Sequence, residues 1–399
     1  MDKAKLENLT GWLMDGARSA PTPIAFLKEM CERLVAAGIP LHRVGAFVRT
    51  LHPDVFGRSF VWHEGADDIA VNTADFDLPD TPQFKNSPLA ILYASGHEVR
   101  YRLDDPESKR FPFFDDMRAE GVTDYIALPL LFTDGTIHAS SWTTTAEGGF
   151  TDEHLAALRA VIPPFSRLGE IHAMRRTAAA LLDTYVGNRA GERILAGQIR
   201  RGHAEDMQAA IWLSDLRGFT ALSDRLAPEA VVDILNQYFD CQVPVIREHG
   251  GEILKFMGDG LLAVFPIAKD GGNLSEVCGR ALAASRKARA NVDAMHYPSG
   301  NAVVERFRFG VALHIGGILF GNIGGMSRLD FTCIGPAVNL AARLEKIASR
   351  THRTIVASAA FAGACANDWT DLGEFPIAGF SKAQRVFGLH DEVSADAAG

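Results

Sequence analysis

The sequence predicts an α+β protein made of two domains joined by a helical linker. Its 399 residues exceed the roughly 100–200 residues of an ordinary domain. Apolar residues make up 47% and charged residues 22%, which is typical of a globular chain and not of a disordered or fibrous one. Helical and strand-like patterns are mixed along both halves. We therefore expect a first domain at 1–163, a linker at 164–206, a second domain at 207–392 and a tail at 393–399.

Composition excludes several classes of protein. The five cysteines are an odd number and form no C-x-x-C pair, so neither a disulfide framework nor a cysteine-rich zinc site is expected. The first residues carry acidic side chains and lack the apolar core of a signal peptide. The longest apolar stretch, 309–323, is interrupted by His314 and by glycines, so we expect no transmembrane helix and no membrane partner. These features favour a cytoplasmic protein.

The charge distribution argues against nucleic-acid binding. The formal net charge is −9, and the acidic excess is concentrated in residues 51–150. No segment has the clustered lysines and arginines that bind a phosphate backbone. We interpret the acidic region as a solvated surface.

The first domain is expected to combine strands with short helices. We predict helices at 23–37, 87–94 and 113–120, strands at 43–50, 59–63 and 98–103, and a long Asp- and Pro-rich loop at 64–82. The clearest element is a hairpin of strands 125–132 and 136–143, because Asp134-Gly135 between them is a pair that tight turns favour. Thr151 then caps a helix with an acidic first turn.

This hairpin and helix, GVTDYIALPLLFTDGTIHASSWTTTAEGGFTDEHLAALRAVI, resemble the closing half of a GAF domain. The resemblance covers residues 20–165 and implies a sensor domain that either binds an unknown small molecule or serves dimerisation. No residue pattern identifies the ligand. The domain's histidines are scattered and read as ordinary surface or core residues, not as haem or metal ligands: His42, His52, His63, His97 and His138.

The linker carries an apolar repeat with coiled-coil spacing. Its apolar positions follow one another at intervals of three and four residues: Ile171, Met174, Ala178, Leu181 and Tyr185. Because about two heptads are present, two interpretations stay open: a short coiled coil between two chains, or an amphipathic helix packed on its own domain. Gly187 and Gly191 are expected to end this helix, and a second amphipathic piece follows at 192–200.

The second domain is expected to follow the order β-α-β-β-α-β, which is the ferredoxin-like arrangement. We predict strands at 208–214, 252–257, 261–265 and 307–315, helices at 230–249, 274–295 and 337–348, and a β-α-β tail. In the strand at 307–315, large apolar residues alternate with smaller or polar ones, which predicts a half-exposed strand.

Two aspartates in this domain are candidate metal ligands. Asp215 ends an apolar strand, and the turn after it contains a glycine and leads into a helix, which suits a phosphate. Asp259 lies in the turn between two paired strands. If the strands are neighbours, the two carboxylates converge and fit Mg²⁺ or Mn²⁺. The alternative is structural, because Asp-Gly is an ordinary hairpin turn and an aspartate at a strand end is an ordinary cap.

Three further side chains could contact a nucleotide. Lys255 interrupts an otherwise apolar strand, where it either extends to solvent or meets a polar partner. Asn339 and Arg343 are spaced i, i+4 on one helix face, where they could bind a ribose and a phosphate together or make a surface contact.

Taken together, three segments resemble the catalytic domain of class III nucleotidyl cyclases: WLSDLRGFTALSD, EILKFMGDGLLAVF and DFTCIGPAVNLAARLE. The resemblance covers nearly all of residues 207–390 and implies two ions, Mg²⁺ or Mn²⁺, per site. It implies these roles: metal ligation for Asp215, Asp259 and the Leu216 backbone, triphosphate binding for Gly218, Phe219 and Thr220, base selection for Lys255 and Thr332, ribose orientation for Asn339, and transition-state stabilisation for Arg343.

The same resemblance implies a reaction and a partner. Lysine with threonine at the base-selecting positions is a variant of the adenylyl pattern, so the expected reaction converts ATP to 3′,5′-cyclic AMP and pyrophosphate. The family's sites form in homodimers, with the metal aspartates from one chain and the other groups from its partner. A guanylate or mixed-specificity cyclase, and a catalytically weak sensing protein, remain alternatives. One departure concerns triphosphate affinity: Ala378 stands where the family often has lysine, and Lys382 follows four residues later.

Overall fold

The computed structural model describes residues 1–50, 55–268, 272–299, 303–326, 328–366 and 369–392, with backbone only at 297–299 and 303–306. Its contacts divide the chain into two compact units, Met1–Leu181 and Leu182–Gly399. The boundary that we predict between residues 163 and 164 falls inside one continuous helix, α6 (Asp152–Val186). The two units are described separately.

The first unit is built on an antiparallel sheet in the order β3-β2-β1-β6-β5-β4. Its strands are β1 (Arg43–Arg49), β2 (Gly57–His63), β3 (Ala70–Ala74), β4 (Val99–Arg102), β5 (Asp124–Leu131) and β6 (Ile137–Thr144). The predicted hairpin is confirmed as β5 and β6. The expected loop at 64–82 is wrong, because it contains β3, an exposed edge strand that no apolar alternation marks.

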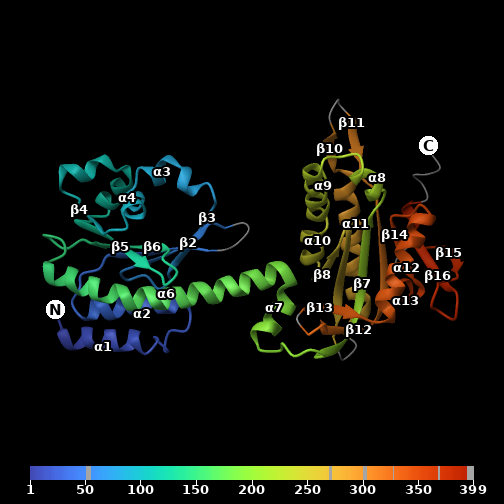
Figure 1. The fold of residues 1–399 in the computed structure, drawn as a ribbon, viewed down its shortest axis with the longest axis horizontal. Helices are drawn as coiled ribbons and strands as arrows, with labels where there is room; N and C mark the ends of the chain where they lie inside the picture. The colour runs from blue at the N-terminus through green and yellow to red at the C-terminus, as the bar shows by residue number, and fades with distance from the viewer. Residues whose placement is uncertain (51–54, 269–271, 300–302, 327, 367–368, 393–399) are drawn as a thin grey trace. The chain divides into compact units, whose positions relative to one another are not determined.

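Helices cover both faces of this sheet (Figure 1). Helices α1, α2 and α6 pack on one face and the short helices α3–α5 lie on the other. The bounds are α1 (Lys3–Met14), α2 (Pro23–Ala36), α3 (Pro82–Lys85), α4 (Pro88–Ser95) and α5 (Asp115–Ala119), with 3₁₀ turns η1 (Leu78–Asp80), η2 (Pro106–Arg110) and η3 (Pro112–Phe114). Helix α1 was not predicted from the sequence, although its buried residues Leu9 and Leu13 have i, i+4 spacing.

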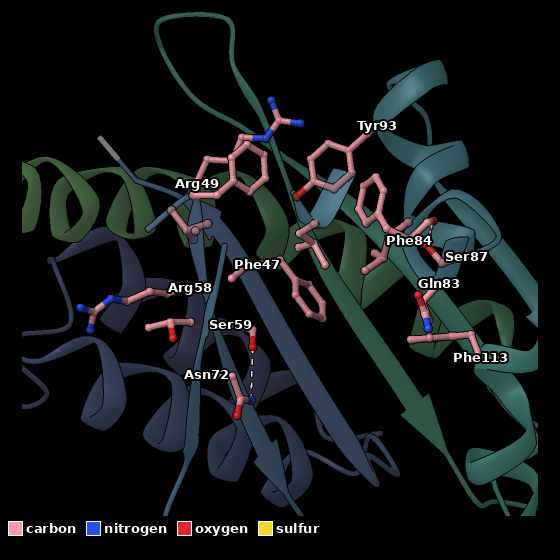
Figure 2. A pocket seen from close by; sticks show the side chains of 17 residues that line it. Phe47, Arg49, Arg58, Ser59, Asn72, Gln83, Phe84, Ser87, Tyr93 and Phe113 are labelled. Atoms are coloured by element: carbon pink, nitrogen blue, oxygen red, sulfur yellow. Dashed lines mark hydrogen bonds between the residues drawn. The ribbon is translucent and has the colours of Figure 1, made fainter. Parts of the chain in front are cut away.

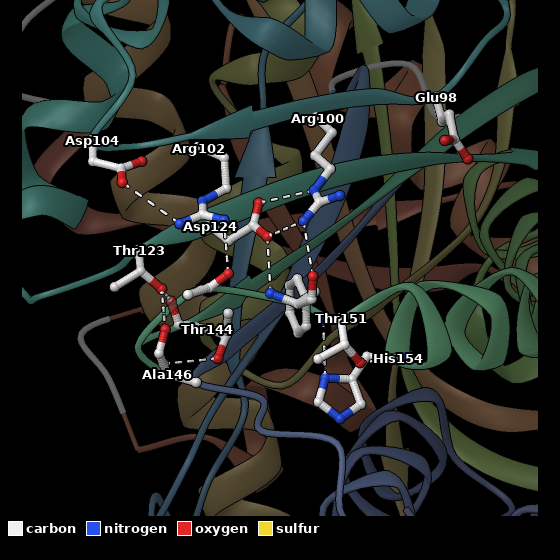
Figure 3. Close-up of polar contacts among 12 residues, drawn as sticks. Glu98, Arg100, Arg102, Asp104, Thr123, Asp124, Thr144, Ala146, Thr151 and His154 are labelled. Carbon is white, nitrogen blue, oxygen red and sulfur yellow. Dashed lines mark hydrogen bonds and ion pairs between the residues drawn. The ribbon is translucent and has the colours of Figure 1, made fainter.

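An ion pair with a buried carboxylate ties the sheet to the start of α6 (Figure 3). Asp124 is fully buried on β5 and accepts hydrogen bonds from Arg100 of β4 at 3.2 and 2.7 Å. The same carboxylate accepts the backbone N–H of Phe150 at 2.9 Å. At Gly149, with φ +73°, an added Cβ would lie 2.5 Å from Asp124 Oδ2. These contacts at Gly149 and Phe150 fix the chain just before α6 begins at Asp152.

Helix α6 has 35 residues and includes Pro163 and Pro164. Prolines remove two backbone hydrogen bonds from a helix interior, so we attribute its continuity to the buried side chains beside them, Val161 and Phe165. Beyond the prolines the coiled-coil positions are exposed: Ile171 45%, Met174 66%, Leu181 38% and Tyr185 80%. The described residues therefore leave most of this apolar stripe uncovered. Helix α6 ends before Gly187 as predicted, but Gly191 does not break a helix, because it lies within α7 (Asn188–Leu195).

The second unit contains an eight-stranded sheet in the order β15-β16-β14-β12-β7-β9-β8, with β13 on β12. Its central order β12-β7-β9-β8 confirms the ferredoxin-like arrangement. The strands are β7 (Ala204–Leu216), β8 (Glu252–Met257), β9 (Gly260–Ile267), β12 (Phe309–Gly324), β13 (Leu329–Ile334), β14 (Ile355–Ser358), β15 (Trp369–Phe375) and β16 (Gln384–Leu389), and β10 (His296–Ser299) with β11 (Val303–Arg306) forms a separate hairpin.

Helices α9–α11 cover one face of this sheet, and α12 packs on the other. The bounds are α8 (Phe219–Ser223), α9 (Pro228–Asp240), α10 (Val243–Glu248), α11 (Leu274–Asp293), α12 (Pro336–Arg350), α13 (Ala359–Ala364) and η4 (His390–Glu392). The helix expected at 230–249 is interrupted between α9 and α10. The half-exposed strand is a wrong prediction, because α12 covers its second face and Ala312 is fully buried. In the described part of the chain, no helix has both the length and the apolar character to cross a membrane.

Candidate active site

The two candidate metal ligands lie on neighbouring strands. Asp215 is the penultimate residue of β7, and its register partner on β9 is Gly260. Asp259 directly precedes Gly260 in the β8–β9 turn, so antiparallel pairing brings the two aspartates together. The odd-numbered residues of β7 face α12 and not α9–α11, which places Asp215 on that side of the sheet. Tertiary structure thus creates a carboxylate pair, Asp215 with Asp259.

The carboxylate pair has unbalanced negative charge. Partial burial, then the Asp259 charge beside it, raises the pKa of Asp215 to about 6. Hard carboxylate oxygens held this close fit a divalent cation such as Mg²⁺, which commonly takes one or two protein carboxylates and completes its shell with phosphate and water. The described residues contain no group of three or more His, Cys, Asp or Glu side chains suited to a metal. Backbone, phosphate or water oxygens could complete the shell of such an ion.

The turn after Asp215 has the conformation that the glycine predicts. Gly218 has a φ of +74°, in the left-handed region, and its carbonyl accepts the Leu222 N–H at 3.0 Å. A Cβ added at Gly218 would meet no neighbouring atom. The positive φ, and not a lack of space, is therefore the reason that glycine is favoured here. Phe219 packs against the core and Thr220 is exposed. Leu216 is buried, and its backbone hydrogen bond lowers the pKa of Asp215 against the larger raising effects.

Lys255 has a partner that was not predicted from the sequence. Its Nζ lies 2.5 Å from the Asp330 carboxylate, which joins β8 to β13. Thr332 stands two residues after Asp330 on β13, and residues two apart share one face of a strand. This spacing is the signal that could have identified Asp330. We refer to Lys255, Asp330 and Thr332 as the base-facing cluster, after the base-selecting role that the sequence resemblance implies for Lys255 and Thr332.

Asn339 and Arg343 are exposed on α12. The opposite side of the helix is buried through Leu340, Leu344 and Ile347, which pack against β12, β14 and β16. Both polar side chains therefore lie on one face of α12, as the i, i+4 spacing predicts, and that face is exposed. Ala378 and Lys382 are exposed too: Ala378 lies within a turn that Ile377 and Phe380 anchor in the core, and Lys382 follows that turn.

A second missed residue is Glu345, which is buried on α12. Burial, and then the charge of Asp215, raises the pKa of Glu345 to about 7, while Arg217 opposes this shift. Arg217 donates to the backbone carbonyl of Arg353 and lies beside Gly310 with Glu345. The sequence signal was an acidic residue on the apolar side of an amphipathic helix.

Comparisons with known proteins agree on the second unit. Residues 203–390 match the family model "Adenylate and Guanylate cyclase catalytic domain". An adenylate cyclase from Anabaena cylindrica is 33% identical over 147 residues, covering 37% of this chain and 28% of that protein. Adenylate cyclase 1 of Rhizobium meliloti is 32% identical over 173 residues, covering 43% and 25%. The chain thus spans about a quarter of the length of these relatives.

Among solved structures, a bacterial light-regulated adenylyl cyclase aligns with a TM-score of 0.47 and 25% identity, covering 58% of this chain and 65% of that one. The family match includes the carboxylate pair, the base-facing cluster, Asn339 and Arg343. Residues 203–390 of this chain are a class III adenylate and guanylate cyclase catalytic domain.

Proposed function

We propose that the chain is an adenylate cyclase that converts ATP to 3′,5′-cyclic AMP and pyrophosphate. The observation that carries this proposal is the convergence of Asp215 and Asp259 beside the Gly218 turn. A carboxylate pair next to open backbone suits a nucleotide triphosphate that arrives with divalent cations.

The proposed roles follow the chemistry of each side chain. Asp215 and Asp259 hold two ions, Mg²⁺ or Mn²⁺, with the Leu216 carbonyl as a backbone ligand. When bound, the ions supply Lewis acidity toward the ribose 3′-hydroxyl and the phosphates. Phe219 and Thr220, with Gly218, line the triphosphate turn. Asn339 orients the ribose, and the permanent charge of Arg343 balances the charge that develops at the α-phosphate.

The choice of ATP rests on the base-facing cluster. Lys255 is a donor without acceptor capacity, so it matches adenine N1, an acceptor, and not the guanine N1–H, a donor. Asp330 holds the amine on the strand face that Thr332 shares. Cys333 is buried on the other side of β13 and is not available to a base. GTP turnover equal to ATP turnover would replace this assignment by a mixed-specificity cyclase.

A homodimer is the proposed active form. Large apolar side chains lie exposed on the strands of the base-facing cluster: Phe256, Met257, Leu329 and Ile334. Exposed apolar groups of this kind are typical of a protein interface. We propose that a second copy covers them, with the carboxylate pair from one chain and Lys255, Thr332, Asn339 and Arg343 from its partner. The exposed stripe of α6 would pair in the same dimer as a short coiled coil.

The first unit is proposed to be a GAF-like sensor domain that regulates catalysis in the cytoplasm. Its antiparallel sheet with helices on both faces supports the sensor assignment. All five cysteines are free thiols, which agrees with a reducing compartment.

The proposal is tested with the purified full chain. ATP or GTP is supplied with Mg²⁺ or Mn²⁺, and cyclic nucleotide and pyrophosphate are quantified by chromatography and mass spectrometry. Cyclic AMP and pyrophosphate in equal amounts, with a higher kcat/KM for ATP than for GTP, are expected. Absence of both cyclic nucleotides under all four conditions would leave the catalytically silent sensor as the function.

A further inference from the structure

The first unit contains a cavity of about 330 Å³ that the cyclase reaction does not use (Figure 2). It lies between strands β1–β3 and the helices α3 and α4, inside the unit Met1–Leu181. Small-molecule sites usually occupy roughly 300–1,000 Å³. A second, much smaller cavity of about 50 Å³ includes Phe60 and Arg176. Only the larger one has room for a ring system.

Strand register explains why the space is open. One cross-strand row on the sheet consists of Phe47, Ser59 and Asn72, and the next consists of Arg49, Gly57 and Ala74. The central residues of these rows, Ser59 and Gly57, have small or no side chains and therefore leave space above the sheet. Five aromatic residues line it: Phe47, Phe56, Phe84, Tyr93 and Phe113. The cavity is therefore a slot with flat apolar walls, which suits a planar ring.

Arg49 provides one positive charge beside this slot. Its guanidinium lies 5.1 Å from the ring centroids of both Phe56 and Tyr93. Its backbone N–H donates a hydrogen bond to His138 Nδ1 of β6 at 3.1 Å, which holds the Arg49 backbone in place. Among the residues that the structure describes, none offers the Arg49 guanidinium a carboxylate within 4.0 Å. Stacking holds the planar fork in place and leaves its N–H donors for an anion.

The remaining polar groups are few. Asn72 donates to Ser59 Oγ at 3.4 Å, a long hydrogen bond that an incoming polar group could replace (Figure 2). Arg58 points away from the rings (Figure 2), because adjacent residues of a strand face opposite sides of the sheet. Gln83 and Ser87 add neutral polar groups on the helix side of the cavity. Among the described residues, the slot thus presents the Arg49 cation toward the rings, a few neutral polar side chains and aromatic walls. A group with two negative charges would keep one of them unpaired in apolar surroundings.

We propose that this cavity binds a small planar aromatic monocarboxylate, with its ring between the aromatic walls and its carboxylate on Arg49. A hydroxyl or ring nitrogen at the far end of the ligand meets Ser59 and Asn72. The inference names a ligand class for the proposed sensor domain and rests on that proposal only for its link to catalysis. Binding itself is independent of the cyclase reaction, so failure of one leaves the other standing.

The test uses matched acids and amides on the full chain without nucleotide. Isothermal titration calorimetry measures indole-3-acetate, 4-hydroxybenzoate and benzoate, each against its carboxamide. The structure predicts that at least one acid binds at least tenfold more tightly than its amide, since a hydrogen bond to a charged group contributes about tenfold or more. No binding by any acid up to about 5 mM, a concentration at which millimolar Kd values register, would overturn the proposal.

Variants assign the binding to this cavity. Arg49→Gln is expected to weaken the acid at least tenfold and remove its advantage over the amide, while Arg58→Gln, on the other face of β2, leaves both affinities within twofold. Ala74→Phe fills the slot and abolishes binding of both molecules. Circular dichroism and thermal unfolding check that each variant folds. Unchanged acid affinity in either Arg49→Gln or Ala74→Phe would refute the assignment, even if wild type binds.

Discussion

The Lys255 amine is held 2.5 Å from the Asp330 carboxylate, across two strands that are distant in sequence. Both side chains are substantially exposed, 42% for Lys255 and 54% for Asp330. An exposed ion pair contributes little to folding because water screens it. The pair therefore matters for where the amine lies: it orients a flexible lysine on the strand face that carries Thr332.

Asp330→Asn should alter substrate selection and leave the fold unchanged. Without its partner the Lys255 amine samples more rotamers, so we expect the ATP/GTP ratio of kcat/KM to fall several-fold, with the free energy of unfolding within about 0.5 kcal/mol of wild type. Steady-state kinetics with both nucleotides measure the ratio. Asp371→Asn is the matched control, because Asp371 forms an equally short exposed pair with Arg385. If the ATP/GTP ratio of kcat/KM is the same in Asp330→Asn as in the control Asp371→Asn, Asp330 has no role in base selection.

Asp259→Ala should abolish turnover without unfolding the chain. Its carboxylate belongs to a turn and contributes little to the core, whereas a two-carboxylate cation site loses half of its protein side-chain ligands. We expect less than about one hundredth of the wild-type rate with Mg²⁺, comparable to losing a major electrostatic contact in the transition state. Residual activity above a tenth of wild type would show that the carboxylate pair is not the metal site.

Mixing two inactive variants tests whether the site is shared between chains. Asp215→Ala and Arg343→Ala homodimers each carry one defect in both sites. In a heterodimer with shared sites, one site collects both defects and the other has none. Random exchange should therefore restore about a quarter of wild-type activity. The measurement is cyclic AMP formation after re-equilibration, with subunit exchange verified by native mass spectrometry. Exchange without recovery would place each site within one chain.

Ala378→Lys should tighten triphosphate binding. Ala378 is exposed, at the position where the family often has lysine. An added ammonium there is expected to lower the KM for ATP about three- to tenfold, with little change in kcat if it acts on the ground state and transition state alike. Lys382→Ala is made both in the wild-type chain and in the Ala378→Lys variant. If it raises the KM for ATP in the wild-type chain but not in the Ala378→Lys variant, then Lys382 already contacts the phosphates in the native protein.

His138 should make the first unit sensitive to acid. Burial, and then the charge of Arg49, lowers the pKa of His138 from 6.5 to about 4, and its Nδ1 must stay unprotonated to accept the Arg49 N–H. The unfolded chain takes up the proton first, so stability is lost as pH falls from about 6.5 toward 4, by roughly 2 kcal/mol at pH 5.

Amide hydrogen exchange of β1 and β6 at pH 7.5 and 5.0 measures this loss. His138→Gln retains an acceptor but does not titrate, so its loss between the two pH values should be smaller by that amount. An identical pH dependence in both proteins would contradict the assignment.

The sequence by itself determined the local elements and the candidate residues. The continuous apolar run of β9, the apolar alternation in β12, the Asp-Gly hairpin turns and the i, i+4 pair on α12 all depend on neighbours within a few residues. Such patterns are readable without coordinates. Polar edge strand β3 escaped prediction because nothing apolar marks it. The continuity of α6 through two prolines was also not predicted, because side-chain packing overrode the low helix propensity of proline.

Only the tertiary structure decided which side chains meet. Asp215 faces Asp259 because β7 and β9 pair in one particular register, and a shift of one residue would place them on opposite faces. Lys255 reaches Asp330, and the row Arg49–Gly57–Ala74 leaves a cavity, for the same reason. Strand register is set by the whole core, through contacts between segments far apart in the chain. A local pattern therefore names the residues, and long-range packing brings them together.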